Sequence, residues 1–381
     1  MIPYGRHHVD ASDVRAVLEV LRGGWLSQGP RIEEFEKKFA RTCGARYAVA
    51  VSSGTAGLHL AGLAGGLAPK TEAITSPLTF VATANAALYC GARPVFSDIE
   101  RNTLNLDMAQ AAKKVTARTR AVLPVHFAGY PCSLKEWFPF FKKRGIVVIE
   151  DACHALGSSS GGGPIGSCRF SDMAVFSFHP LKSITTGEGG MVTTHSERFY
   201  RALLRLRNHG LERDPARMSA WEGPWYYQMQ SLGFNYRLTD FQCALGLSQL
   251  RKLPAFIKRR KQLAGLYLKE LKGIPWIELP QAKLPAYLSS SAHHLFVVRL
   301  RMELLPFGRK ELVERLRALG VGTQVHYIPV HRHPYYESLG YRKGLCPKAE
   351  SEYEKLLSLP LFYEMKDSDL KKVVAALKVC A

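Results

Sequence analysis

Short apolar runs alternate with stretches of helical spacing from about residue 48 to residue 195. YAVAVSS (47–53), EAITSP (72–77) and IVVIEDA (146–152) are compact enough for strands that end in a turn. GTAGLHLAGLAGGL (54–67) and TFVATANAALYCG (79–91) lie between such runs and carry apolar residues at helical spacing. Strands that alternate with helices predict an α/β fold with a mostly parallel central sheet and helices on both faces.

The pattern changes near residue 253. KLPAFIKRRKQLAGLYLKELKG (252–273) predicts a long helix, and LFVVRLRM (295–302) and VGTQVHY (321–327) predict strands. Further helices are predicted at residues 309–320 and 368–379. We therefore expect a large domain over residues 10–253 and a smaller C-terminal α+β domain over residues 254–381, with residues 1–9 packing nearby.

Composition narrows the class of protein. The 381 residues are 46% hydrophobic and 22% charged, which is typical of a globular chain. None of the eight cysteines forms a CxxC pair or pairs with histidines at zinc-finger spacing, so we expect reduced core thiols and no metal site. The sequence has no signal-peptide pattern and no apolar run of membrane-spanning length. We expect a cytoplasmic protein without a membrane partner.

The formal net charge of +20 has three interpretations. The lysines and arginines are dispersed, which favours a solvated basic surface. A positive potential would also attract anionic cofactors and nucleotide diphosphates, which is the second interpretation. Duplex binding is the third, and no nucleic-acid-binding motif supports it. We expect no nucleic-acid partner.

Candidate chemistry gathers where three predicted strands end, which is where parallel α/β sheets place their ligands. The first cluster is Ser52-Ser53-Gly54-Thr55, at the start of a helix whose free N–H groups suit an anion, although a simple helix cap fits it too. The second runs from Glu150 to His154. A buried acidic pair needs a partner, for which a salt bridge or a protonated pyridine ring would serve.

The third cluster is the segment FSFHPLKSITTGEGG (176–190), with Lys182 in a loop between two predicted strands. A lysine that forms a Schiff base must be held near its aldehyde with a lowered pKa. Ser177 offers a phosphate contact, and the glycines after Lys182 permit a tight turn beside a bulky ligand. A solvated loop lysine is the alternative, and none of the three clusters decides between the interpretations alone.

Together, in this order, the motifs resemble the sugar aminotransferases of the DegT/DnrJ/EryC1/StrS family. The resemblance extends from GGWLSQGPRIEEFEKKFA (23–40) through SSGTAGLHL, TFVATANAAL, GARPVFSDI, EDACHALGS and FSFHPLKSITTGEGG to GFNYRLTDFQCALGLSQL (233–250). It implies the fold type I architecture of enzymes that depend on pyridoxal 5′-phosphate (PLP), with pyridoxamine phosphate as the cofactor's intermediate form. Related dehydratases replace the lysine by histidine, and Lys182 is intact here.

The resemblance also implies a role for each matching residue. Lys182 would carry PLP as a Schiff base and shuttle protons, Asp151 would pair with the ring nitrogen, and His154 would lie near the phenolic oxygen. Phe80 would stack on the ring. The phosphate would be held by Ser53, Gly54, Thr55 and Ser177, and by Asn235 of a neighbouring subunit, which requires a homodimer with shared active sites.

The expected substrates are L-glutamate and a UDP-sugar. Details such as QVHYIP (324–329) and IPYGR (2–6) resemble the branch that aminates UDP-4-keto-6-deoxy-N-acetyl-β-L-altrosamine in pseudaminic acid biosynthesis. A UDP-4-keto-pentose or a dTDP- or GDP-4-keto-6-deoxyhexose stays open as an alternative. The candidate sugar-binding residues are Tyr4, Arg237, His326 and Tyr327, and a purely structural role for His326 is an equal alternative.

Overall fold

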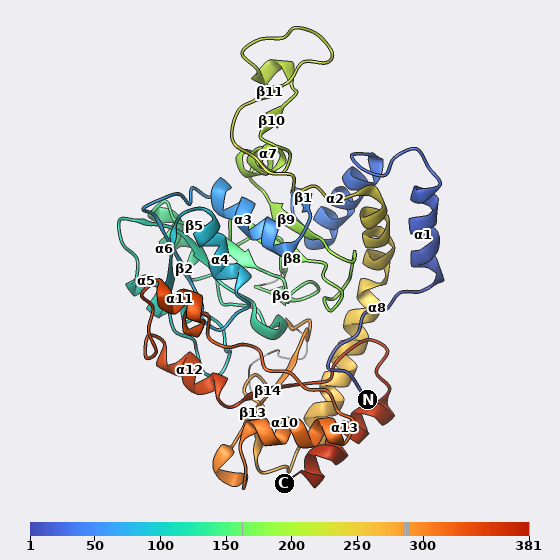
Figure 1. Ribbon diagram of the computed structural model, residues 1–381, viewed down its shortest axis with the longest axis vertical. Helices are drawn as coiled ribbons and strands as arrows, with labels where there is room; N and C mark the ends of the chain where they lie inside the picture. Colours follow the sequence, from blue (N-terminus) through green and yellow to red (C-terminus); the bar gives the residue numbers. More distant parts are fainter. Residues whose placement is uncertain (162, 283, 285, 287–289, 381) are drawn as a thin grey trace.

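A seven-stranded sheet forms the centre of the protein (Figure 1). The computed structural model describes residues 1–161, 163–282, 284, 286 and 290–380. β9 (Gly190–Thr194) pairs antiparallel with both of its neighbours, and the other adjacent pairs are parallel. The strand order is β1 (Tyr47–Val51), β9, β8 (Met173–Ser177), β5 (Val147–Asp151), β4 (Thr119–Leu123), β2 (Glu72–Thr75) and β3 (Arg93–Phe96).

Alternate residues of each central strand face two different hydrophobic cores, because successive side chains of a strand point to opposite faces. Ala48 and Ala50 of β1 join a core with α2 (Pro30–Cys43) and the first half of α8 (Asp240–Glu270). Val49 and Val51 join a core with α3 (Gly54–Ala64), α4 (Ala82–Tyr89) and α7 (Glu197–Leu206). The result is a three-layer α/β/α arrangement.

Separate helices pack on the half of the sheet that contains β4, β2 and β3. α5 (Met108–Lys113) and α6 (Phe138–Lys143) pack on a core that includes Ile74, Val122 and Val148. α11 (Pro334–Ser338) and α12 (Pro347–Tyr353) lie near α5 on the same flank (Figure 1). The short α1 (Ala11–Leu21) packs on α8.

A smaller antiparallel sheet lies toward the C-terminus, in the order β12 (Ile277–Glu278), β13 (Phe296–Leu300) and β14 (Leu356–Leu359). Its core also contains the second half of α8, α10 (Arg309–Ala318) and α13 (Asp367–Val379). Ile2 bridges to Val321, so the N-terminal segment packs on this part. The 31-residue α8 runs unbroken through Leu253 and Pro254, where we expected the domain boundary, so that division stays a prediction.

An arm projects from the body between α7 and α8 (Figure 1). The two short strands β10 (Leu211–Glu212) and β11 (Gln228–Met229) pair antiparallel at its stem. Large apolar side chains on the arm are exposed, notably Trp225 at 70% and Leu232 at 75%. Such exposure on an extended segment is typical of a protein contact.

The fold class predicted from the sequence is confirmed, with some local differences. Residues 321–327 form no strand, because only single bridges at Val321 and Gln324 link them to other segments. β14 was not predicted. The loop expected at residues 158–163 contains the two-residue strands β6 (Ser159–Ser160) and β7 (Gly163–Pro164).

All eight cysteines are free thiols, as expected, and only Cys153 is not fully buried. Among the described residues, no helix is long and apolar enough to cross a membrane.

Candidate active site

A cavity of about 730 Å³ opens at the carboxyl ends of β1, β5 and β8. This is within the size range of small-molecule and cofactor sites. Of the residues predicted from the sequence, the following line it: Tyr4, Ser53, Gly54, Thr55, Phe80, Asp151, His154, Ser177, Lys182, His326 and Tyr327.

The first wall of the cavity is the N-terminus of α3. Ser53 caps the helix by accepting a hydrogen bond from the Ala56 N–H at 3.0 Å. A Cβ atom at Gly54 would lie 2.9 Å from the Ser177 Cβ, so only glycine lets the helix start come this close to the end of β8. Ser53, Thr55 and Ser177 therefore surround one spot where helix N–H groups and the helix dipole favour an anion.

Asp151 is 5% exposed at the end of β5. Its Oδ2 accepts a hydrogen bond from the Thr83 hydroxyl at 2.6 Å, and its Oδ1 accepts one from the Cys153 N–H at 3.1 Å. Among the described residues, Asp151 has no ion pair with a lysine, arginine or histidine. A buried carboxylate held in one orientation without a cation is suited to a cationic ligand.

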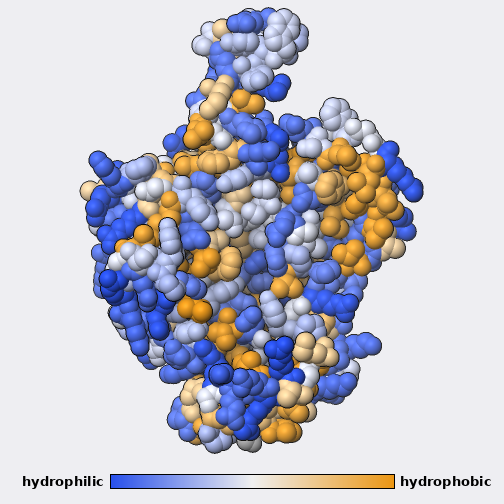
Figure 2. Space-filling view, viewed as in Figure 1, coloured by the Kyte–Doolittle hydropathy of each residue, from blue (hydrophilic) through white to orange (hydrophobic). Residues whose placement is uncertain are grey.

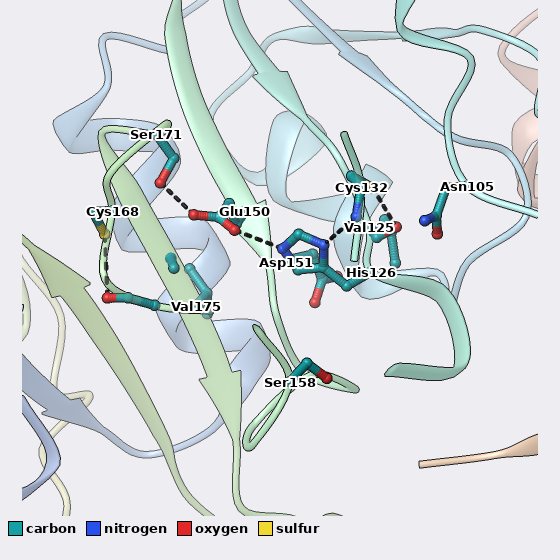
Figure 3. A network of polar contacts seen from close by, with 12 residues as sticks. Asn105, Val125, His126, Cys132, Glu150, Asp151, Ser158, Cys168, Ser171 and Val175 are labelled. Atoms are coloured by element: carbon teal, nitrogen blue, oxygen red, sulfur yellow. Dashed lines mark hydrogen bonds and ion pairs between the residues drawn. The ribbon is translucent and has the colours of Figure 1, made fainter. Parts of the chain in front are cut away.

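A buried hydrogen-bond network joins Glu150 of β5 to His126 and Ser171 (Figure 3). The His126 Nδ1 accepts the Cys132 N–H at 2.9 Å, so the Nε2 nitrogen carries the proton toward Glu150, 2.6 Å away. The Ser171 hydroxyl donates to the other oxygen of Glu150. The two neighbouring acidic residues therefore differ: both oxygens of Glu150 accept hydrogen bonds within the protein, whereas Asp151 lines the cavity.

Lys182 lies in the loop between β8 and β9, and its backbone N–H donates to the His179 carbonyl at 2.9 Å. Burial lowers the pKa of the Lys182 ammonium from its ordinary value, and the nearby Cys153 and Asp151 oppose this shift. No carboxylate of the described residues lies within ion-pair distance of its amine. A nucleophile or proton shuttle needs a neutral amine, and the lowered pKa makes this form more populated at Lys182 than on a surface lysine.

Three aromatic side chains, those of His154, His294 and Tyr327, also line the cavity. The Tyr327 hydroxyl and the His154 Nε2 lie 3.1 Å apart, and the rings of His154 and His294 are centred 4.3 Å apart. Burial, followed by the charge of Lys182 and neighbouring histidines, lowers the pKa of His154 well below its usual value. The His154 Nδ1 is buried without a hydrogen-bond partner among the described residues, which points to a polar ligand atom.

His326 and Tyr4 lie beside each other in the cavity, with ring centres 5.6 Å apart. The His326 Nδ1 is 2.8 Å from the Ser358 hydroxyl. Burial, and secondarily the charge of Lys182, lowers the pKa of His326 to about 4 from an ordinary value of 6.5. His326 is therefore a neutral imidazole at pH 7.

This shift makes the fold acid-sensitive. Between pH 6.5 and about 4, the unfolded chain binds a proton at His326 that the folded chain does not, so stability falls as the pH falls. At pH 5 the His326 contribution to this loss is about 2 kcal/mol. Urea unfolding at pH 7 and pH 5 should show the His326→Asn variant losing about 2 kcal/mol less than the parent. Equal losses in the two proteins would contradict the prediction.

The chain is similar to known proteins along nearly its whole length. The sequence profile of the DegT/DnrJ/EryC1/StrS aminotransferase family matches residues 7–378. The spore coat polysaccharide biosynthesis protein SpsC of Bacillus subtilis is 40% identical over 379 residues, covering 99% of this chain and 96% of that protein.

This chain belongs to the DegT/DnrJ/EryC1/StrS aminotransferase family. Among solved structures, Helicobacter pylori PseC, an aminotransferase of pseudaminic acid biosynthesis, has a TM-score of 0.89 and 30% identity, covering 100% of this chain and 98% of that one. The PMP form of the sugar aminotransferase Spr1654 from Streptococcus pneumoniae has a TM-score of 0.90 and 27% identity, with 100% and 99% coverage.

Two residues predicted from the sequence lie outside this cavity. Asn235 is exposed at the base of the arm and forms a backbone bridge with Asn208. Arg237 donates a hydrogen bond to the Asn208 side chain. Neither lines the cavity of its own chain. The structure of one subunit therefore does not support the predicted role of Arg237 in sugar binding.

Thr83 and His294 are among the cavity-lining residues that were not predicted from the sequence. Thr83, which orients Asp151, lies in the segment TFVATANAAL that carries the family resemblance, so a signal was present. His294 had no such signal. It follows the run SSSAH and enters the cavity because the backbone at residues 293–295 packs against the tight turn at Ala128–Gly129.

Proposed function

We propose that this aminotransferase binds PLP in the cavity and transfers an amino group from L-glutamate to a UDP-linked 4-keto-6-deoxy sugar, with UDP-4-keto-6-deoxy-N-acetyl-β-L-altrosamine as the first candidate. The observation that carries the proposal is that Lys182, its amine free of ion pairs among the described residues, and the cation-free carboxylate of Asp151 line one cavity with the N-terminus of α3.

The residues present fit the cofactor. The start of α3 with Ser177 would hold the phosphate, and Asp151 would hold a protonated ring nitrogen. The His154 Nδ1, which is buried and has no partner among the described residues, would form a hydrogen bond with an oxygen of the cofactor. Phe80, 57% exposed at the cavity wall, would cover the ring. Solved relatives in PLP and PMP forms support the assignment.

PLP, when bound, supplies an electron sink for the charge that develops when a substrate loses its α-proton. The chain's own residues would do the rest. The Lys182 amine, kept neutral more readily by burial, takes the proton from the amino donor and later returns one to the aminated sugar. The Asp151 carboxylate, held by Thr83 and the Cys153 N–H, fixes positive charge at the ring nitrogen.

The choice of sugar rests on relatives. The likeness to PseC favours the pseudaminic acid branch, and the neutral His326 beside Tyr4 offers uncharged hydrogen-bonding groups for sugar hydroxyls or an N-acetyl group. SpsC, a spore coat polysaccharide biosynthesis protein, is more identical to this chain at 40%, so we keep the alternative of another nucleotide 4-keto sugar, such as a UDP-4-keto-pentose or a dTDP- or GDP-4-keto-6-deoxyhexose.

A substrate panel tests this proposal. Purified protein is loaded with PLP and ¹⁵N-labelled L-glutamate, and each keto sugar nucleotide is added in turn, with mass spectrometry of the sugar product. The proposal expects ¹⁵N in the 4-amino sugar formed from the UDP-4-keto-6-deoxy sugar, and the highest kcat/KM for that substrate. Transfer to a dTDP-sugar or a pentose alone would replace the first candidate by the alternative, and transfer to none would contradict both.

We also propose a homodimer with shared active sites. The exposed Trp225 and Leu232 on the arm support a contact with a second copy, and Asn235 at the base of the arm does not line the cavity of its own subunit. In a two-fold dimer the Asn235 of one subunit would then reach the phosphate held by the other.

Subunit complementation tests the shared site. Lys182→Ala and Asn235→Ala should each be poorly active alone. A 1:1 mixture, unfolded and refolded together, should regain about a quarter of parental activity, because half of the dimers are mixed and each has one intact site. Activity no higher than the sum of the separate variants would contradict a shared site.

A further inference from the structure

A second groove lies far from the catalytic cavity, along the outer edge of the central sheet. Two adjoining hollows of about 600 Å³ and 300 Å³ follow edge strand β3 and share Glu72, Arg93 and Tyr341 in their walls. They extend along the whole of β3 and reach the first residue of β2, Glu72, whereas the catalytic cavity lies at the carboxyl ends of β1, β5 and β8. Among the described residues, none lines both the groove and the cavity.

The groove is strongly basic. Its walls come from α5 and the residues after it, from β3, and from the loop at residues 340–345, and hydrophilic side chains cover this flank in Figure 2. The cationic side chains that line it are Lys70, Arg93, Lys113, Lys114, Arg118, Arg342 and Lys343. Glu72 is the acidic residue among the lining residues, and it is 4% exposed.

Most of this charge is not neutralised by the protein. Arg118 pairs with Glu72 at 2.7 Å, and the Thr116 hydroxyl donates to the other oxygen of that carboxylate at 2.6 Å. For the other six cations, no carboxylate of the described residues lies within ion-pair distance. Six uncompensated charges around one groove repel each other, and a polyanion would relieve that repulsion.

The edge of β3 is closed to an added peptide strand. The Lys114 ammonium donates to the Phe96 carbonyl at 2.6 Å, and the Tyr341 hydroxyl donates to the Pro94 carbonyl. Pro94 has no N–H to offer. Two outward carbonyls of β3 are thus occupied and one outward N–H is missing, which disfavours strand addition. Tyr341 is 7% exposed, so its ring offers no face on which a nucleic-acid base stacks.

We infer that this basic groove binds a linear chain of phosphate groups. Recognition is through the negative charge of the phosphates and not through nucleic-acid bases. Arg342 is held at the rim because its Nη1 donates to the carbonyls of Glu337 and Tyr341, and Arg93 lies over the Tyr341 ring at 5.8 Å. Guanidinium groups anchored in this way match phosphate oxygens in forked hydrogen bonds, and the lysines on the other wall add point charges. Inorganic polyphosphate and the backbone of single-stranded RNA share this chemistry.

Binding measurements on the full-length protein test the inference. Fluorescent polyphosphate, single-stranded RNA and poly-glutamate of equal charge are titrated by anisotropy between 50 and 200 mM salt. With six phosphate contacts, affinity should fall roughly 300-fold over this range. Removing three contacts in Lys113→Gln/Arg342→Gln/Lys343→Gln should weaken binding about 100-fold at 100 mM salt and halve the salt dependence.

The control removes the same charge elsewhere. Lys258, Lys371 and Lys372 are exposed on α8 and α13, and their triple change to Gln should alter affinity by less than about threefold. Polyphosphate binding without RNA binding, or the reverse, identifies the source of the phosphate chain and supports the inference. Equal losses in the two triple variants, equal binding of poly-glutamate, or no binding would overturn it. Amino transfer should be unchanged in the groove variant, so this test is independent of the proposed function.

Discussion

Changing Lys182 to Ala should lower the rate of amino transfer by about 10⁴-fold or more. Proton transfer by a positioned group contributes about 10²–10⁴-fold, and among the described residues Lys182 is also the only lysine that lines the cavity. Its amine has no ion-pair partner in that part of the chain, and burial lowers its pKa, so no neighbouring group duplicates it. The measurement is the kcat of the half-reaction with L-glutamate, followed by the cofactor's absorbance.

Two controls separate chemistry from folding. Lys258→Ala removes an exposed lysine from α8 and should leave the rate unchanged. Adding a small primary amine to Lys182→Ala should restore part of the rate, because the missing proton carrier is then supplied from solution. A Lys182→Ala protein that keeps more than about a hundredth of the activity would refute the role, since that loss is the smallest that proton transfer contributes.

The second large effect is expected at Asp151. Asp151→Asn keeps the size of the side chain but removes the buried negative charge that would face a protonated ring. Breaking a buried charge pair costs about 3–5 kcal/mol, which corresponds to roughly 10²–10³-fold or more in rate if it is lost in the transition state. The kcat of the glutamate half-reaction should fall accordingly.

Thr83→Val is the matched variant for this prediction. It removes the 2.6 Å hydrogen bond to the Asp151 Oδ2 and leaves the charge in place. A lost hydrogen bond to a charged group costs about 1.5–3 kcal/mol, so a roughly ten- to hundredfold loss is expected. Equal rates for Asp151→Asn and the parent would show that the carboxylate does not act on the ring.

The large sheet was predictable because its signal is local. β1, β5 and β8 are short apolar runs followed by small or acidic residues, and the order of strands and helices restricts the topology. The clusters at the ends of these strands could therefore be assigned to one cavity from the sequence alone. β14 was missed because LLSL is short and its pairing with β13 is a long-range contact.

The rest of the site depends on tertiary packing. Nothing near residue 294 in the sequence indicates a cavity, and His294 reaches it only because residues 293–295 pack against the turn at Ala128–Gly129. Glu150 and Asp151 look alike in the sequence, yet His126 and Ser171 from distant segments satisfy one of them and leave the other for a ligand. The +20 charge looked dispersed for the same reason, since the basic groove gathers cationic residues from four separate segments of the chain.

Reductive trapping tests the role of Lys182 most directly. The protein is incubated with PLP, treated with sodium borohydride to reduce any lysine imine to a stable secondary amine, digested, and mapped by mass spectrometry. The predicted result is a phosphopyridoxyl mass on the peptide that contains Lys182, and its absence from Lys182→Ala. Labelling of a different lysine, or of none, would contradict the assignment of this cavity as the PLP site.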